Sequence, residues 1–323
     1  MEVAAVRELT PWQVQAAWIR HMKRGEWADA WRISDTELQR RRSQECAHEP
    51  RHLQLVWDGR SLEARRVLVH CYHGLGDTVQ LIRLLPLLRG KTLSTIVWAQ
   101  PPLIPLLRTA AGIDELLPLH DGEPQVDHDV DIEVMELLHA LRLTPETLPR
   151  NVPYFNITPV ASPPARRGPL KVGLVWQSGG WDTRRSISWS LISRLVGIHG
   201  IQWQILQRGP ALTSWPAGMG VAPRMSTVLD EAVAVQRLDL LISVDTLSAH
   251  LAGALGVPTW TLLPFDADWR WLEGRDDSPW YPTMRLFRQS EPGDWSGVIE
   301  RVAASLGPWK VRARADRGAR LLT

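Results

Sequence analysis

Cysteine is scarce in this sequence. Cys46 and Cys71 are the two cysteines among 323 residues, and they lie on dissimilar segments without metal-ligand spacing. No uninterrupted apolar run approaches the roughly 18 residues of a membrane span. The first ten residues lack the basic start and the apolar core of a secretory leader. These absences favour a reducing cytoplasm and argue against a structural metal site.

The sequence has no large excess of positive or negative charge, because its formal net charge is +2. The composition therefore gives no general argument for nucleic acid binding. The locally basic stretch, residues 310–320, is predicted to be a solvated and frayed end. The G-x-S-x-G elbow of serine hydrolases and the full G-x-G-x-x-G dinucleotide fingerprint are missing. A content of 44% hydrophobic and 22% charged residues is typical of a soluble globular protein, and the length leaves room for two domains.

Residues 1–60 are predicted to be helical. Thr10 and Gln13 form a capping-box pattern around a proline, and residues 34–37 repeat the capping-box logic. Gly25 is expected to join two helices into one tetratricopeptide-like hairpin. A solenoid needs at least about three such units, so we interpret the hairpin as a cap on the next domain or the remnant of an array. Its tryptophans are expected to serve packing.

A strand at 66–71 opens the first alternating series, and a loop with Gly74 and Gly76 leads into a helix at 78–88. Asp77 follows this loop at the predicted carboxyl end of the strand, where it either serves chemistry or caps the helix. The next elements are expected at 95–99, 102–111, 116–119 and 134–143. Strands and helices that alternate in this way predict a parallel sheet.

The composition changes to proline and glycine at 151–168, which predicts a linker. A second alternating series follows, with strands at 171–176, 203–207, 240–244 and 259–263 and helices at 190–198, 229–235 and 246–255. A polar, glycine-rich loop at 177–180 follows the first of these strands. The sequence thus predicts a second parallel sheet.

The strand at 240–244 and the helix at 246–255 form the most informative stretch of the chain. A helix N-terminus at the carboxyl end of a strand is an anion site, because unpaired N–H groups and the helix dipole point outward. Thr246 and His250 are four apart and project from one face there. The alternative is an ordinary turn in which Asp245 is the N-cap and nothing more.

Two further features suggest ligand contacts. Arg184 and Arg185 lie between the first strand and the first helix of the second series, where a guanidinium could pair bidentately with a phosphate. The alternative is a solvated loop. The tryptophan-rich residues 269–281 could stack on a sugar or base, but rigid packing is the favoured interpretation.

Several of these segments carry a family resemblance. They are residues 57–59, 74–78, 172–176 and 185–187, the more specific 244–246 and 250–256, and their continuation at 263–265, 268–271, 278–282 and 285–287. Across about 53–302, roughly three quarters of the chain, the sequence resembles glycosyltransferase family 9, the heptosyltransferase group. It is most similar to the bacterial branch in which such a domain follows tetratricopeptide repeats.

The resemblance implies an α/β protein of GT-B fold, with two Rossmann-like domains facing a cleft. The implied divisions are a helical region 1–60, an acceptor domain 61–158, a donor-nucleotide domain 159–308 and a basic tail 309–323. It implies inverting transfer without a metal or other cofactor, from a nucleotide-diphosphate sugar (heptose is one candidate). The acceptor is a glycan, lipopolysaccharide, another lipid-linked molecule or a protein. Location in the cytoplasm, with peripheral contact at the inner membrane face as an option, fits these partners.

Site residues carry over by position. Asp77 matches the catalytic base that follows the loop of Gly74 and Gly76, and Arg185 matches a basic residue facing the donor diphosphate. The remaining donor-binding residues implied are Ser178, Gln207, Asp245, Thr246 and His250. The chain departs from the branch at His73, which stands where glutamine is common and is a second candidate base. The reduced repeat array puts recognition of a protein acceptor by a solenoid in doubt.

Physical chemistry supports these assignments. A helix terminus alone contributes only about 0.3–1 kcal/mol at an exposed site, so a diphosphate leaving group without a metal needs a cation such as Arg185. Two other functions use the same architecture. One is a sugar-nucleotide epimerase, and the other is a binding module that has lost turnover.

Overall fold

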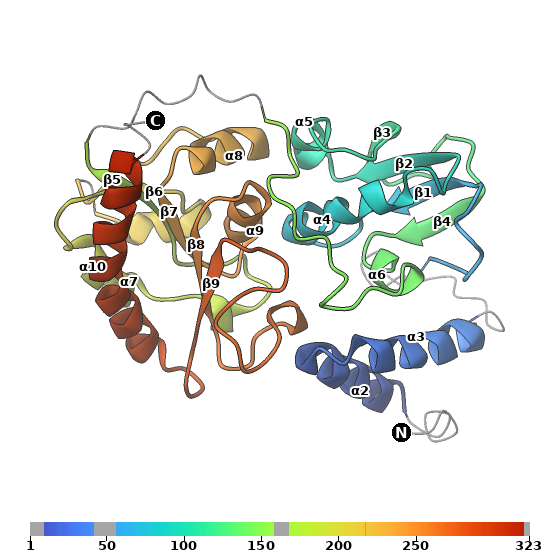
Figure 1. Ribbon diagram of the computed structural model, residues 1–323, viewed down its shortest axis with the longest axis horizontal. Helices are drawn as coiled ribbons and strands as arrows, with labels where there is room; N and C mark the ends of the chain where they lie inside the picture. Colours follow the sequence, from blue (N-terminus) through green and yellow to red (C-terminus); the bar gives the residue numbers. More distant parts are fainter. Residues whose placement is uncertain (1–9, 42–55, 158–167, 217, 320–323) are drawn as a thin grey trace. The chain divides into compact units, whose positions relative to one another are not determined.

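The computed structural model describes residues 10–41, 56–157, 168–216 and 218–319. The chain forms two compact units, each built around one parallel sheet (Figure 1). The first unit holds residues up to Phe155 together with Asp268–Gly274, and the second holds Asn156–Ala267 and the chain from Arg275 onward. The short segment 268–274 therefore belongs to the first unit, although strands of the second unit precede and follow it.

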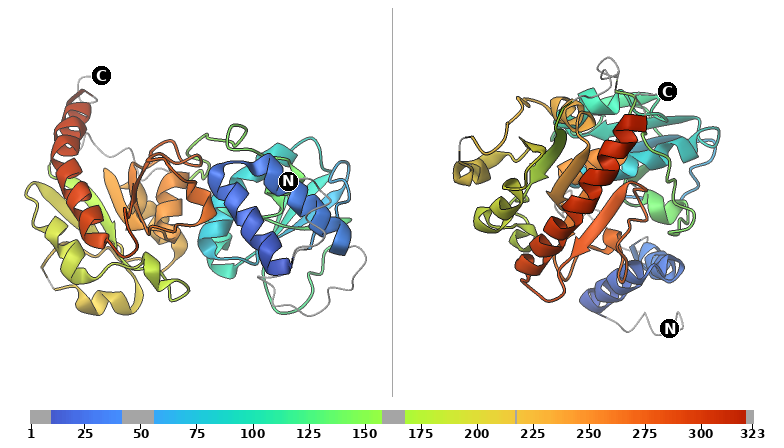
Figure 2. Two further views of the ribbon diagram at one scale, coloured as in Figure 1. Left: turned by 90° about the horizontal axis from the view of Figure 1, so that it is seen from below. Right: turned by 60° about the vertical axis from the view of Figure 1, so that its left-hand side comes forward.

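A helical hairpin opens the described chain, formed by α2 (Pro11–Arg24) and α3 (Trp27–Arg41) (Figure 2). The predicted capping box is present, because the Thr10 hydroxyl accepts from the Gln13 N–H and the Gln13 side chain accepts from the Thr10 N–H. Gly25 ends α2 in a left-handed conformation (φ 77°), which a side chain would strain. Two helices joined at Gly25 are confirmed, while the tetratricopeptide-like character of the hairpin stays a prediction. Of the region 1–60 that was predicted to be helical, residues 1–9 and 42–55 lie outside the described chain, and residues 56–60 are not helical, so the prediction is wrong there.

The capping pattern at 34–37 does not start a helix, and that prediction is wrong. Helix α3 runs through these positions because its buried face, including Trp31, Ile33 and Leu38, is continuous there. The Ser34 hydroxyl accepts a hydrogen bond from the Trp18 indole at 3.1 Å instead of capping a helix. Packing between the two helices thus determines the length of α3.

The first sheet has the order β3-β2-β1-β4, and all of its strand pairs are parallel. Its strands are β1 (Arg66–His70), β2 (Ser94–Ala99), β3 (Glu115–Pro118) and β4 (Val130–Glu133). The parallel sheet is confirmed, but β4 was not predicted, because its sequence VDIE has too few apolar residues for a buried-strand signal.

Between residues 66 and 155 the helices are shorter than predicted. They are α4 (Leu75–Leu81), η2 (Ile82–Leu88), η3 (Pro101–Leu103), α5 (Ile104–Leu107) and α6 (Leu137–Ala140). The predicted helix at 78–88 begins earlier, at Leu75, and becomes a 3₁₀ helix from Ile82 onward. Pro86 lies inside that segment and lacks the N–H that an α-helix needs.

The second sheet has the order β6-β5-β7-β8-β9 and is also parallel throughout. Its strands are β5 (Leu170–Val175), β6 (Ile201–Ile205), β7 (Leu240–Val244), β8 (Thr259–Leu263) and β9 (Met284–Arg288). Strands β7 and β8 have the predicted bounds, and every residue of β7 is buried. A central strand covered on both faces requires such a continuous apolar run.

Helices cover both faces of this sheet. Helices α7 (Trp189–Val196) and α10 (Trp295–Ala319) share one core with the sheet. Helices α8 (Val228–Gln236) and α9 (Leu247–Ala254) pack against each other on the other face (Figure 1). Two 3₁₀ turns, η4 (Thr183–Arg185) and η5 (Gly209–Ser214), follow β5 and β6.

The basic residues near the C-terminus are helical, so the prediction of a frayed end is wrong as far as Ala319. Arg317 forms an ion pair with Asp239, and Lys310 donates to the carbonyl oxygen of His199 at 3.0 Å. These contacts hold the last turns of α10 to the body of the second unit.

The tryptophans of the hairpin and of residues 269–281 mostly serve packing, as predicted. Trp27, Trp31, Trp269, Trp271 and Trp280 are all buried, whereas Trp12 at the start of α2 is exposed. In the described residues, no helix combines the length and the apolar character that crossing a bilayer requires.

Candidate functional site

The first cluster lies at the carboxyl end of β7, in the second unit. Asp245 follows the strand, and the N-cap position of α9 belongs to Thr246, so Asp245 is not the N-cap. The Thr246 hydroxyl contacts the Ser243 hydroxyl at 3.0 Å and does not cap α9. The side chain at the N-cap position therefore does not compete with a ligand for the first N–H groups of α9.

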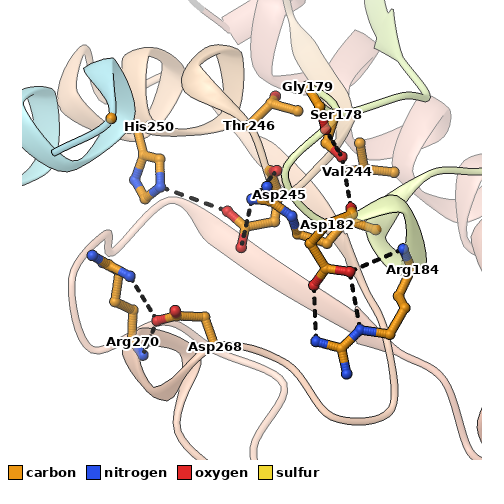
Figure 3. A network of polar contacts seen from close by, with 12 residues as sticks. Ser178, Gly179, Asp182, Arg184, Val244, Asp245, Thr246, His250, Asp268 and Arg270 are labelled. Carbon is orange, nitrogen blue, oxygen red and sulfur yellow. Dashed lines mark hydrogen bonds and ion pairs between the residues drawn. The ribbon is translucent and has the colours of Figure 1, made fainter. Parts of the chain in front are cut away.

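The Asp245 carboxylate lies between the side chains of His250 and Arg185. One of its oxygens is 3.6 Å from Nε2 of His250 (Figure 3), and the other is 3.8 Å from Nη1 of Arg185. The tighter contact of Arg185 is with the backbone, because Nη1 donates to the Asp245 carbonyl oxygen at 3.1 Å. Nε of Arg185 is buried and has no partner among the described residues, so the guanidinium keeps unfilled hydrogen-bonding capacity.

His250 is buried and held from both sides. Its Nδ1 lies 3.0 Å from the Tyr281 hydroxyl, and its Nε2 faces Asp245. Tyr281 in turn packs on Gly253, where an added Cβ would lie 2.4 Å from the ring carbon Cγ. The glycine therefore allows the contact that fixes the imidazole.

Gln207 and Ser178 shape the loop after β5. The Gln207 amide oxygen accepts from the N–H groups of Trp176 and Gln177, both at 2.9 Å, and its amide nitrogen donates to two carbonyl oxygens. Ser178 donates to the Asp182 carbonyl oxygen at 3.1 Å. Both side chains make hydrogen bonds that support the loop, and their contact with the donor stays a prediction.

The neighbouring residues Arg184 and Arg185 have different partners. Arg184 forms a bidentate pair with Asp182 at 2.9 and 3.0 Å (Figure 3), and this hydrogen bond lowers the pKa of Asp182. Arg185 points to the start of α9 instead. Arg185 is therefore the cation that can reach a ligand at this helix start.

The second cluster lies after β1, in the first unit. Asp77 is in the first turn of α4, whose N-cap is Gly74, and Gly76 lies in the same turn. One carboxylate oxygen, Oδ2, accepts from the Gly74 N–H at 2.9 Å. The other, Oδ1, lies 2.6 Å from Nη2 of Arg270.

His73 is hydrogen-bonded to a buried carboxylate, with Nδ1 2.9 Å from Oε1 of Glu133. Burial alone would lower the pKa of His73, but the hydrogen bond and the charges of Glu133 and Asp77 raise it overall. Stabilising the protonated imidazole leaves a smaller fraction of His73 in the neutral form that can accept a proton.

Arg270 is the residue that sequence reasoning did not place in a site. It is in the 3₁₀ turn η6 (Trp269–Trp271), its side chain is 10% exposed, and it also pairs with Asp268. The signal available was an arginine between two tryptophans within 268–271, which indicates packing. No spacing rule connects it with Asp77.

The described residues contain one group of His, Asp and Glu side chains whose ligand atoms lie close enough to hold a metal ion. It is His21, Glu26 and Asp29 on the helical hairpin, outside both clusters.

Comparison with known proteins supports the fold. No protein-family model matches the chain. Protein FlbA of Caulobacter vibrioides is 26% identical over 288 residues, which are 77% of this chain and 48% of that protein, so the chain spans about half the length of this curated relative. The crystal structure of a glycosyl transferase of family 9 from Veillonella parvula matches 78% of this chain and 99% of its own, with 13% identity and a TM-score of 0.56.

A structure of E. coli heptosyltransferase WaaC with ADP matches 79% of this chain and 99% of its own, with 14% identity and a TM-score of 0.47. The likeness to the Veillonella structure, together with the two parallel sheets, confirms the predicted α/β fold of GT-B type. The likeness to the branch with tetratricopeptide repeats stays a prediction, as do the roles of the site residues.

Proposed function

We propose that this protein is a glycosyltransferase that takes its sugar from a nucleotide-diphosphate sugar. The observation that carries this proposal is the cluster at the start of α9, where Nε of Arg185 has no partner among the described residues and the Thr246 side chain does not cap the helix. It occurs in a fold similar to a glycosyl transferase of family 9. An inverting, metal-independent reaction is part of the proposal, with heptose among the candidate sugars.

The donor diphosphate is assigned to this cluster in the second unit. A charge-assisted hydrogen bond contributes about 1.5–3 kcal/mol, more than the roughly 0.3–1 kcal/mol of an exposed helix terminus. Arg185 is therefore the principal contact, and the N–H groups of α9 add to it. Leaving-group charge grows during transfer, so the same cation stabilises the transition state.

Asp77 in the first unit is assigned as the general base that takes the proton of the acceptor hydroxyl. Each carboxylate oxygen has two lone pairs, and the contacts with Gly74 and Arg270 use one on each oxygen. A second lone pair on each oxygen stays available for the proton. A positioned base of this kind accelerates transfer by about 10²–10⁴-fold.

A thermal-shift panel with ADP, UDP, GDP and CDP tests the donor assignment. A ligand at 100 times its dissociation constant stabilises the folded state by about 2.7 kcal/mol, which raises the melting temperature by several degrees. We expect one nucleotide to give such a shift, with and without EDTA. Absence of a shift with every nucleotide would contradict the proposed donor site, and loss of the shift in EDTA would contradict metal independence.

Incubation with the corresponding sugar nucleotide then separates the candidate reactions. A transferase releases nucleotide faster when a glycan, lipid-linked or protein acceptor is added. Isomerisation of the sugar without nucleotide release would indicate an epimerase. Binding with no chemical change under either condition would indicate a module without turnover.

A further inference from the structure

We propose that Arg270 is a positioning residue for Asp77, and that the helical hairpin α2–α3 holds the segment that carries it. The inference rests on the proposed function for the role of Asp77 as the base. The physical arrangement itself stands on contacts within the first unit, to which the hairpin, Asp77 and Asp268–Gly274 all belong.

The carboxylate of Asp77 is fixed at both oxygens. Nη2 of Arg270 donates to Oδ1 at 2.6 Å, and the N–H of Gly74 donates to Oδ2 at 2.9 Å. Contacts from two different segments restrict rotation about the side-chain bonds, so the plane of the carboxylate is defined before a substrate binds. Without Arg270, the Gly74 contact would restrain Oδ2 only, and Oδ1 would have lost its hydrogen bond.

Arg270 is itself held on several sides. Its Nη1 donates to Oδ1 of Asp268 at 2.8 Å (Figure 3), its Nη2 lies 3.3 Å from Sδ of Met135, and its guanidinium carbon is 4.8 Å from the centre of the Trp269 ring. A largely buried cation is costly unless it is paired, and here two carboxylates share it. Their combined charge fixes the guanidinium between Asp77 and Asp268.

The hairpin holds the Arg270 segment through side chains and backbone. The Trp269 ring meets Trp18 at 5.6 Å and Trp27 at 6.0 Å, both close to perpendicular. The N–H of Glu273 donates to the carbonyl oxygen of Lys23 at 2.9 Å. Edge-to-face aromatic pairs of this kind have preferred geometries, so they fix the direction of the segment as well as its distance.

The hairpin is in turn attached to the rest of the first unit. The indole of Trp31 donates to the carbonyl oxygen of Leu143 at 2.7 Å, and Asp35 pairs with both His139 and Arg142. A chain of direct contacts therefore runs from the body of the unit through α3 and α2 to Trp269, Arg270 and Asp77. A single hairpin makes all of these contacts, so holding the Arg270 segment does not require a longer repeat array.

A double-mutant cycle tests the ion pair without any assumption about function. Each of the substitutions Asp77→Asn and Arg270→Gln by itself removes the charge-assisted hydrogen bond. We therefore expect the double variant to be more stable than the sum of the two single effects predicts, by about tenfold in the equilibrium constant of unfolding. Additive effects of the two substitutions would overturn the proposal.

Kinetics and exchange distinguish positioning from a merely structural role. Arg270→Ala is expected to lower kcat for nucleotide release by about 10- to 100-fold, with the KM of the sugar nucleotide within about threefold. Added guanidinium ion should restore part of kcat, and Arg270→Lys should retain part of it. The matched control is Arg275→Ala, since Arg275 also pairs with an aspartate, Asp277, at 2.6 Å and belongs to the second unit.

Hydrogen exchange at the Gly74 amide gives a readout that needs no turnover. Arg270→Ala should speed this exchange about tenfold as Asp77 loses its restraint, while Arg275→Ala should not. If the wild-type protein turns over no sugar nucleotide, the proposed function is contradicted. Energetic coupling in the mutant cycle and faster Gly74 exchange in Arg270→Ala would still support the positioning of Asp77 in that case. Unchanged exchange, or kcat loss without guanidinium rescue, would overturn the positioning role.

Discussion

Replacing Arg185 with alanine is the sharpest perturbation of the proposed donor site. The guanidinium has one hydrogen bond to protein, to the Asp245 carbonyl oxygen, and a buried Nε without a partner in the described residues. Removing the guanidinium should therefore weaken ligand binding more than it weakens the fold. One charge-assisted contact to phosphate is worth about 1.5–3 kcal/mol, which is about 10- to 100-fold in the dissociation constant.

The assay is calorimetric titration of wild type and Arg185→Ala with the nucleotide diphosphate that gives the largest thermal shift. Arg184→Ala is the matched control, because the neighbouring guanidinium is bound to Asp182 by two hydrogen bonds. We expect that control to bind within about twofold of wild type, as for exposed pairs in general. Equal affinity of Arg185→Ala and wild type would refute the assignment, and an equal loss in both variants would show that only net charge matters.

Other consequences are testable with single substitutions. Asp77→Asn should lower turnover by at least about 10²-fold while donor affinity stays within a few-fold, and His73→Gln should keep most of the turnover; the reverse pattern in the kinetic assays would make His73 the base. The pKa of His73 is raised in the folded protein, so its protonation stabilises the fold below the unfolded pKa, and that contribution is lost as pH rises through the folded pKa. Melting curves should therefore show His73→Gln less stable than wild type in mildly acidic buffer, with the difference fading toward alkaline pH, and a constant difference would contradict this linkage. Gly253→Ala should destabilise the protein by about 1–3 kcal/mol in chemical denaturation, because its Cβ would lie 2.4 Å from the Tyr281 ring. The control Gly197→Ala, at the end of α7 with φ −72°, meets no atom within 4 Å outside its chain neighbours and should change stability by less than about 0.5 kcal/mol; similar effects of the two substitutions would count against the steric argument.

Local signals in the sequence were sufficient to predict the central strands of the second sheet. The run at 240–244 is apolar because β7 is covered on both faces, and the polar residues that follow mark its carboxyl end. Such a signal depends only on neighbours in the chain. The position of Arg185 beside Asp245 could be inferred because the two residues follow the adjacent parallel strands β5 and β7, whose carboxyl ends lie at the same edge of the sheet.

Contacts between distant segments could not be predicted in this way. The pattern at 34–37 has the chemistry of a helix start, but packing against Trp18 determines its structure. Asp245 has the chemistry of an N-cap, yet its carboxylate faces His250 and Arg185 instead. In each case a tertiary contact replaced the local hydrogen bond that the residue type favours.

Arg270 shows the same limit at the candidate base. Its sequence neighbours are tryptophans, and only the folded chain brings the guanidinium to Asp77. The segment around it lies between two strands of the second unit, although it packs in the first. A pattern of residue types carries no signal for such a placement.

Nucleotide release from the sugar nucleotide that matches the best-binding diphosphate tests the proposed glycosyl transfer most directly. It is measured in wild type and Asp77→Asn, with and without a glycan or protein acceptor. We predict release that the acceptor accelerates in wild type and that falls by at least about 10²-fold in Asp77→Asn. A sugar nucleotide that stays intact with every acceptor, or one that isomerises without releasing nucleotide, would contradict glycosyl transfer.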